Sequence, residues 1–88
     1  QDGTRYFHAN SVNPQDSVPA GQDAIAVGPA TVVNGNNGIG IGSSAVVGPS
    51  AVGGIAIGPN TQATGIASTA LGAGSQAHGS QSLALGAG

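Results

Sequence analysis

The segment Gly54-Ile55-Ala56-Ile57-Gly58 decides the fold that this sequence predicts, because it recurs with small changes along the chain. Its other copies are Ala24-Ile25-Ala26-Val27-Gly28, Gly38-Ile39-Gly40-Ile41-Gly42, Ser68-Thr69-Ala70-Leu71-Gly72 and Ser82-Leu83-Ala84-Leu85-Gly86. The closing glycines are spaced 14, 16, 14 and 14 residues apart. The chain is therefore built from a repeat of about 14 residues.

Each repeat contains a second short segment that also ends in glycine. These segments are Val33-Asn34-Gly35, Val46-Val47-Gly48, Ala63-Thr64-Gly65 and Ala77-His78-Gly79. On this alignment, the 16-residue step comes from a longer return turn over residues 49–53 and a second segment that is one residue shorter. The glycines expected at the turns are Gly28, Gly42, Gly58, Gly72, Gly86, Gly35, Gly48, Gly65 and Gly79.

A strand, a glycine turn, a second strand and another turn describe one coil of a β-solenoid. A helix is disfavoured by the glycine content, because glycine in a helix interior costs about 1 kcal/mol per residue relative to alanine. Collagen is excluded because glycine does not recur at every third position. The sequence therefore predicts an all-β solenoid of about five coils.

The two strands of a coil have different patterns. In Gln62-Ala63-Thr64 and Gln76-Ala77-His78, polar and apolar residues alternate, which predicts one exposed and one buried face. In the first strand both faces are apolar, because Ile55 and Ile57 share one face and Ala56 lies on the other. The second strand can cover only one of these faces, so we expect another subunit to cover the other.

The sequence does not decide which face of the first strand lines the coil and which meets the other subunit. The residues expected to be divided between the coil interior and this subunit interface are Ile25, Val27, Ile39, Ile41, Ile55, Ile57, Leu71, Leu83 and Leu85, together with the alanines between them.

The composition excludes several classes of function. One Lys or Arg among 88 residues and a net charge of −2 leave no basic patch for a nucleic acid or an anionic membrane surface. The absence of cysteine excludes disulfide bonds and thiolate zinc sites, and it is compatible with an extracellular setting. One Tyr, one Phe and no Trp or Met restrict the core to small side chains between closely spaced backbones.

An acyltransferase of the β-helix class is an alternative, because residues 57–63 superficially fit the hexapeptide rule of those enzymes. Their coils contain three hexapeptides, roughly 18 residues, whereas the repeat here has 14. His78 is the one candidate for a catalytic base, and no carboxylate lies near it in the sequence. We therefore predict no enzymatic activity and no cofactor.

Other site types also lack their required pattern. His8 has no second ligand at metal-binding spacing, and residues 38–42 lack the nucleotide-binding fingerprint. No aspartate follows Asp23, although calcium-binding solenoids need recurring aspartates. An ice-binding solenoid needs a regular ladder of threonines, and we expect the threonines to fall at different positions of the repeat: Thr31, Thr61, Thr64 and Thr69. The serines of the repeats, such as Ser68 and Ser75, are interpreted as turn-forming residues.

The segment Ala24-Ile25-Ala26-Val27-Gly28-Pro29-Ala30 and its copies resemble the head repeat of YadA-like trimeric autotransporter adhesins, whose strand motif is close to Ser-Val-Ala-Ile-Gly. The resemblance extends over residues 22–88, with departures at Gly38, Gly40 and Thr69. The opening run Tyr6-Phe7-His8-Ala9-Asn10-Ser11 resembles the connector that leads into such heads.

This resemblance implies a left-handed parallel β-roll that assembles as a homotrimer. Residues 1–22 are then expected to form a connector and first turn, and residues 23–88 the head repeats, in five coils of which the last is incomplete. Because the sequence runs from Gln1 to Gly88 within a repeat, we expect it to be part of a longer protein. The resemblance places that protein on the cell surface of a Gram-negative bacterium, anchored in the outer membrane by a region outside this sequence.

Heads of this kind are associated with binding to extracellular matrix proteins such as collagen, and with self-association. We therefore expect an adhesin head that attaches bacteria to host matrix or host cells. The alternative is a structural spacer of the surface fibre that has no ligand of its own. The exposed residues are small and uncharged, so the sequence does not specify the ligand.

Overall fold

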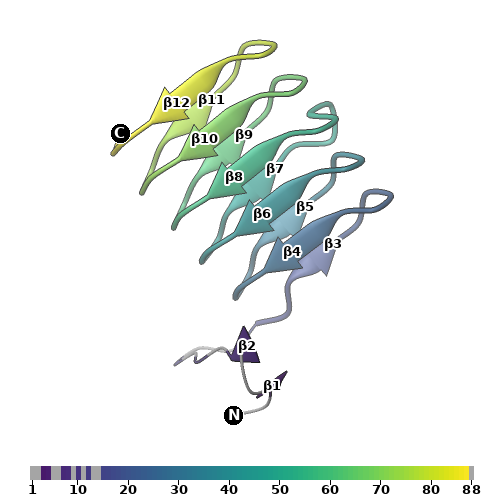
Figure 1. The fold of residues 1–88 in the computed structure, drawn as a ribbon, viewed down its shortest axis with the longest axis vertical. Helices are drawn as coiled ribbons and strands as arrows, with labels where there is room; N and C mark the ends of the chain where they lie inside the picture. The colour runs from purple at the N-terminus through teal and green to yellow at the C-terminus, as the bar shows by residue number, and fades with distance from the viewer. Residues whose placement is uncertain (1–2, 5–6, 9, 11, 13–14, 88) are drawn as a thin grey trace.

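The chain forms a two-sheet β-solenoid in the computed structural model, which describes residues 3–4, 7–8, 10, 12 and 15–87 (Figure 1). This described part consists of strands and turns, and it contains no helix that is long and apolar enough to cross a membrane. Apart from the repeats, β1 (Gly3–Thr4) and β2 (Phe7–His8) form an antiparallel pair.

The first sheet contains the first strand of each coil, in the order β12-β10-β8-β6-β4. Its strands are β4 (Ile25–Val27), β6 (Ile39–Ile41), β8 (Ile55–Ile57), β10 (Thr69–Leu71) and β12 (Leu83–Leu85). The second sheet has the order β11-β9-β7-β5-β3. Its strands are β3 (Val18–Pro19), β5 (Val32–Val33), β7 (Val46–Val47), β9 (Gln62–Ala63) and β11 (Gln76–Ala77).

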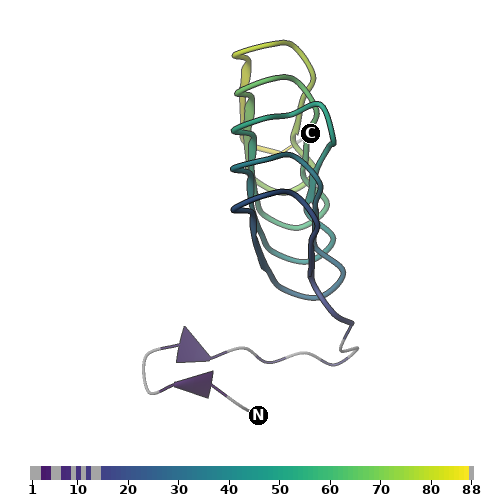
Figure 2. The same cartoon turned by 90° about the vertical axis from the view of Figure 1, so that its right-hand side faces the viewer.

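All strand pairs in both sheets are parallel, and each strand pairs with its equivalent in the next coil. Ile25 pairs with Ile39, and Ile39 pairs with Ile55, so the pairing follows the sequence repeat. Figure 2 shows the coils from the side, stacked along the long axis. The predicted all-β solenoid with coils of about 14 residues is confirmed. Parallel pairing begins at Val18, within the segment that the sequence assigns to the connector and first turn.

The core between the two sheets is thin, and most of its members are alanine or valine. Its buried hydrophobic residues are Val33, Ala45, Val47, Ala51, Ala56, Ala63, Ala70 and Ala77. Ala56 and Ala70 are the middle residues of their first-sheet strands, so the small residue of each strand points inward. The larger residues on either side of it therefore point out of the coil.

Volumes in the core are complementary between the two sheets. A Cβ at Gly40 would lie 2.7 Å from Val33 Cγ2, and a Cβ at Gly54 would lie 3.0 Å from Val47 Cγ1. Valine in the second sheet thus occupies the space that glycine leaves in the first. This packing explains why the second coil tolerates Gly38 and Gly40 in place of the larger residues of the repeat.

Buried hydroxyl groups close the turns. Thr61 Oγ1 donates to the carbonyl oxygen of Gly58 at 2.9 Å, and Ser68 Oγ donates to that of Gly65 at 2.6 Å. These bonds satisfy carbonyl groups that the sheets leave unpaired. The short side chains that make them occupy little of the core. The interpretation of Ser68 as a turn-forming residue is confirmed.

The prediction that the threonines fall at different positions of the repeat is wrong for Thr31 and Thr61. The register of the second sheet makes them equivalent, and both are fully buried. Thr31 Oγ1 donates to the carbonyl oxygen of Gly42 in the next coil at 2.8 Å, where Ala45 supplies no hydroxyl. The shared position is therefore structural, and it forms no exposed threonine ladder.

The 16-residue step lies wholly in the turn between β7 and β8, which contains residues 48–54. The prediction of a second segment shortened by one residue is wrong, because the register places Gly48 at the position of Thr64 rather than that of Gly65. Ala51 holds the Gly65 position, and its carbonyl oxygen accepts a hydrogen bond from the Gly54 amide at 2.9 Å. The two extra residues therefore leave both sheets in register.

The closing glycines of the first strands stack on one another at one corner of the solenoid. Their φ angles lie between 97° and 142°, a region that L-residues rarely adopt. A Cβ at Gly42 would lie 2.6 Å from the carbonyl oxygen of Gly58, and a Cβ at Gly72 would lie 2.9 Å from the carbonyl carbon of Gly86. Both the backbone angle and the stacking distance therefore require glycine.

We expect Gly42→Ala to destabilise the protein by about 3 kcal/mol or more, because it combines backbone strain with a collision against the next coil. Gly53→Ala is the matched control. Gly53 has a φ of 71° with open space around it, and Ala67 adopts a φ of 55° at the equivalent turn position. We expect this control to cost about 1 kcal/mol. Equal losses of stability in thermal unfolding would contradict the role of the stacked corner.

We also expect Gly40→Ala to cost about 1–3 kcal/mol by overpacking against Val33. Val33→Ala should cost roughly 2 kcal/mol through lost burial and a cavity. The double variant should cost clearly less than the sum, because the new methyl group fills part of the space that valine leaves. Denaturant unfolding of the four proteins measures this coupling, and strict additivity would refute the complementary packing.

Candidate subunit interface

The outward side of the first sheet presents two parallel columns of side chains, which we call the aliphatic face. Nine of its ten positions are aliphatic, and the tenth is Thr69. The columns are Ile25, Ile39, Ile55, Thr69 and Leu83, and Val27, Ile41, Ile57, Leu71 and Leu85. All ten are exposed or half-buried in the single chain. Ile25 is 51% exposed and Leu83 is 66% exposed, although both are large apolar residues.

This arrangement places all nine aliphatic residues that the sequence singled out on the outside of the coil. Only the small residues between them, such as Ala56 and Ala70, are buried between the sheets. Residue size thus decides which face of the first strand lines the coil interior. The coil interior has room for alanine and valine, and the isoleucines and leucines lie on the face that the same chain does not cover.

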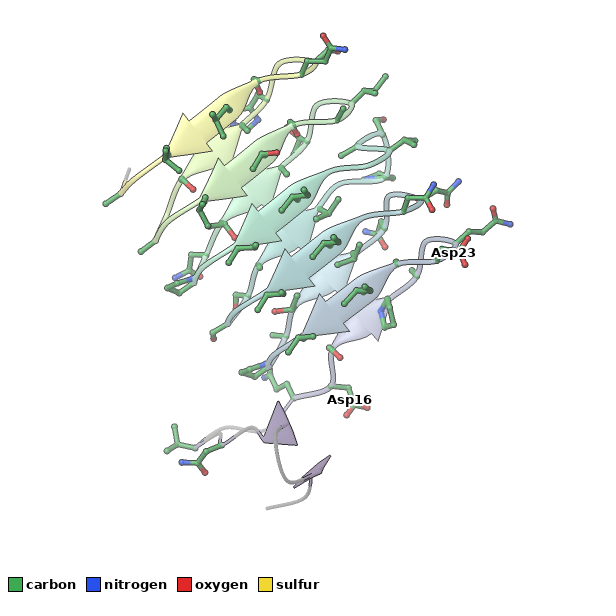
Figure 3. All side chains as sticks on the ribbon, viewed as in Figure 1. Asp16 and Asp23 are labelled. Atoms are coloured by element: carbon green, nitrogen blue, oxygen red, sulfur yellow. The ribbon has the colours of Figure 1, made fainter. Side chains whose placement is uncertain are left out.

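No charged residue interrupts the aliphatic face. Among the described residues, only Asp16 and Asp23 carry a formal charge at neutral pH, and neither lies on a first-sheet strand. Figure 3 views this face and shows both carboxylates away from the strands, with side chains on the sheet that are almost all carbon. A continuous uncharged apolar surface of this kind is typical of an interface with another protein.

The outward side of the second sheet differs along its length. In its C-terminal half Gln62 and Gln76 are exposed while Ala63 and Ala77 are buried, as the alternation in the sequence predicts. In its N-terminal half the same outward column carries valine instead: Val18, Val32 and Val46. The alternation seen in the later repeats does not predict this valine column. The valine pairs Val32-Val33 and Val46-Val47 do indicate it, because only one residue of each pair can point inward and the other must point outward.

His78 lies on this exposed polar surface. Its Nδ1 is 2.7 Å from Thr64 Oγ1, and its Nε2 is 3.1 Å from Gln76 Oε1. The tautomer that donates from Nε2 to Gln76 leaves Nδ1 to accept from the Thr64 hydroxyl. Both nitrogens are therefore engaged by uncharged side chains. Within the described ranges, no three His, Asp or Glu side chains are grouped so that they could hold a metal ion.

The second set of predicted turn glycines is not uniform. Gly35 and Gly65 are buried, and a Cβ on either would collide with backbone of the next coil, at Ala51 and Gly79 respectively. At Gly48 a Cβ would make only ordinary contacts, the nearest at 3.4 Å. Glycine is therefore required at Gly35 and Gly65 because the backbone of the next coil lies close to them, and not because of the turn type.

The connector residues fall at the edge of the described part. Tyr6, Ala9 and Ser11 lie outside the described residues. Phe7 and His8 form β2, and Asn10 is exposed. The assignment of residues 6–11 as a connector stays a prediction.

Comparison with protein families supports the reading of the repeats. A family model described as the YadA head domain repeat (2 copies) matches residues 20–46, 50–75 and 63–88. These three matches include all five strands of the first sheet, and they leave out residues 47–49, where the longer turn begins. Searches of curated proteins and of solved structures found no match to the chain.

Proposed function

The chain belongs to the family of YadA head domain repeats, and on this premise we propose that it is the head segment of a trimeric adhesin. Its family is one of structural adhesin domains, not of enzymes, and it implies display on a bacterial cell surface. In this proposal residues 1–22 form the connector and first turn, and residues 23–88 form the head. The outer-membrane anchor belongs to a region outside this sequence.

The aliphatic face is the observation that supports a trimer. Its exposed isoleucines and leucines would remain in contact with water in a single chain, which is unfavourable by about 25 cal/mol for each Å² of apolar surface. Copies of the same chain are the proposed cover, because the family is trimeric and each copy carries an equally long aliphatic face. Three such faces turned toward a common axis remove the columns from water together.

The outward side of the second sheet supports the adhesive role. If the aliphatic faces meet at the axis, the second sheets form the outer surface of the trimer. There Gln62, Gln76, Thr64 and His78 offer polar donors and acceptors at the regular spacing of stacked strands. We propose that such a surface binds a host matrix protein or cell-surface ligand. A spacer that only projects another domain is the second candidate.

Ile57→Asp tests the trimer. A carboxylate at this position would be buried without a partner at the subunit interface, which costs several kcal/mol. In the single chain the side chain is only half-buried and points away from the core, so we expect the coil to stay folded. Light scattering should therefore report dissociated chains, while circular dichroism retains the β-signal at low temperature.

Gln62→Asp is the control for the trimer test. It places the same carboxylate on the exposed side of the next strand along the chain, and we expect the trimer to persist with a stability change within about 0.5 kcal/mol. A wild-type chain that is a folded monomer at micromolar concentration would sink the trimer proposal. So would an Ile57→Asp protein that assembles as well as the control.

Adhesion is tested with the folded trimer and a panel of immobilised matrix proteins and host cells. We expect saturable binding to at least one component of the panel. We expect this binding to weaken when Gln62 and Gln76 are both changed to alanine, because these exposed side chains lie on the proposed ligand surface. Absence of binding, together with unchanged adhesion of cells whose surface protein lacks this segment, would favour the spacer.

A further inference from the structure

Two large apolar side chains are exposed on neighbouring turns beside the aliphatic face. Val52 lies in the turn between β7 and β8 and is 45% exposed, and Ile66 lies in the turn between β9 and β10 and is 54% exposed. The Ala67 amide donates to the carbonyl oxygen of Val52 at 2.9 Å, so the two turns stack directly on each other. We call Val52 and Ile66 the apolar turn pair.

The apolar turn pair belongs to one edge of the solenoid, which is formed by the turns that lead from the second sheet to the first. The equivalent positions in the other coils of this edge are polar: Gln22, Asn36 and Ser80. At the opposite edge, the described turns that follow the first-sheet strands contain no exposed large apolar side chain. The exposed apolar surface therefore extends beyond the first sheet on one side only.

The apolar turn pair adjoins the aliphatic face. Val52 and Ile66 precede Ile55 and Thr69 of that face by three residues, which corresponds to at most about 10 Å of backbone. Figure 3 shows the edge to which both turns belong, at the end of the first-sheet strands where Asp23 lies. A partner that covers the beginning of β8 and β10 therefore also reaches the apolar turn pair.

The aliphatic face alone is too small for a stable subunit interface. It spans the five strands of the first sheet, which are about 4.8 Å apart, and its two columns are about 7 Å apart. With its side chains the face thus has an area on the order of 300 Å², whereas a stable interface buries roughly 800 Å² on each partner. The proposed trimer therefore needs further surface beside the face, and the apolar turn pair lies there.

We infer that the subunit interface extends from the aliphatic face around this edge, and that a second copy of the chain covers Val52 and Ile66. The inference rests on the trimer proposed above. In a closed ring of three identical chains, each contact joins two different surfaces of the partners. An apolar extension at only one edge fits such a contact, because that edge of each chain then packs against a different surface of its neighbour.

The absence of cysteine allows a test with single introduced thiols. Ile66→Cys and Ala73→Cys place a thiol on either side of β10, at opposite edges of the solenoid, and both positions are exposed in the single chain. In the trimer we expect the thiol at position 66 to react with a soluble disulfide reagent at least about tenfold more slowly than that at position 73, because it reacts only when the interface opens. When each change is combined with Ile57→Asp to separate the chains, the two rates should become similar.

A second measurement uses the assembly itself. Changing both Val52 and Ile66 to serine should leave the coils folded, because both side chains are exposed in the single chain. It should raise the concentration at which the trimer dissociates by about tenfold or more, because apolar contact between subunits is lost. Ala73→Ser is the control and should leave assembly unchanged.

Equal labelling of the two thiols in the trimer would overturn the inference, and so would unchanged assembly of the double serine variant. A wild-type chain that is monomeric would instead contradict the proposed trimer itself.

Discussion

The stacking of closing glycines at one corner is the constraint on which the other features of this solenoid depend. The coils lie so close there that a Cβ at Gly42 would meet the carbonyl oxygen of Gly58, and the backbone enters a region of φ that favours glycine. Because that corner recurs in register, every strand is aligned with its equivalent in the next coil. A ladder of identical positions follows, and each position acquires one environment for the whole length of the protein.

The thin coil also determines where the large residues lie. With the sheets close together, the interior accepts alanine, glycine, valine and small hydroxyl residues, and it compensates locally, as where Val33 fills the space beside Gly40. Isoleucine and leucine in the same strands are left on the outside. A larger protein would cover them with its own layers, but the described residues of this chain add only the short pair β1–β2 to the two sheets. The fold thus leaves an uncovered aliphatic face as a consequence of its own core size.

The repeat period, the parallel stacking and the all-β class could be predicted from the sequence, because they depend on glycine spacing and on period-two alternation. Three features could not. The alignment of Gly48 with the turn glycine Gly65 was wrong, because the sequence does not show whether a loop glycine is required by close stacking or by the turn type. The shared position of Thr31 and Thr61 was hidden by the two-residue insertion at residues 48–54. The division of the first strand into inner and outer faces depends on the distance between sheets, which no local pattern encodes.

A solenoid of this kind leaves few positions free to encode a specific function. The corner positions require glycine, the inner columns require small residues, and the aliphatic face is proposed to meet other copies of the chain. The outward column of the second sheet is under none of these constraints. Its residues also change from apolar to polar along the solenoid, from Val32 and Val46 to Gln62 and Gln76. A side chain there can change without altering the backbone or the core. Recognition of the proposed ligand is therefore best sought in that column and in the exposed turns beside it.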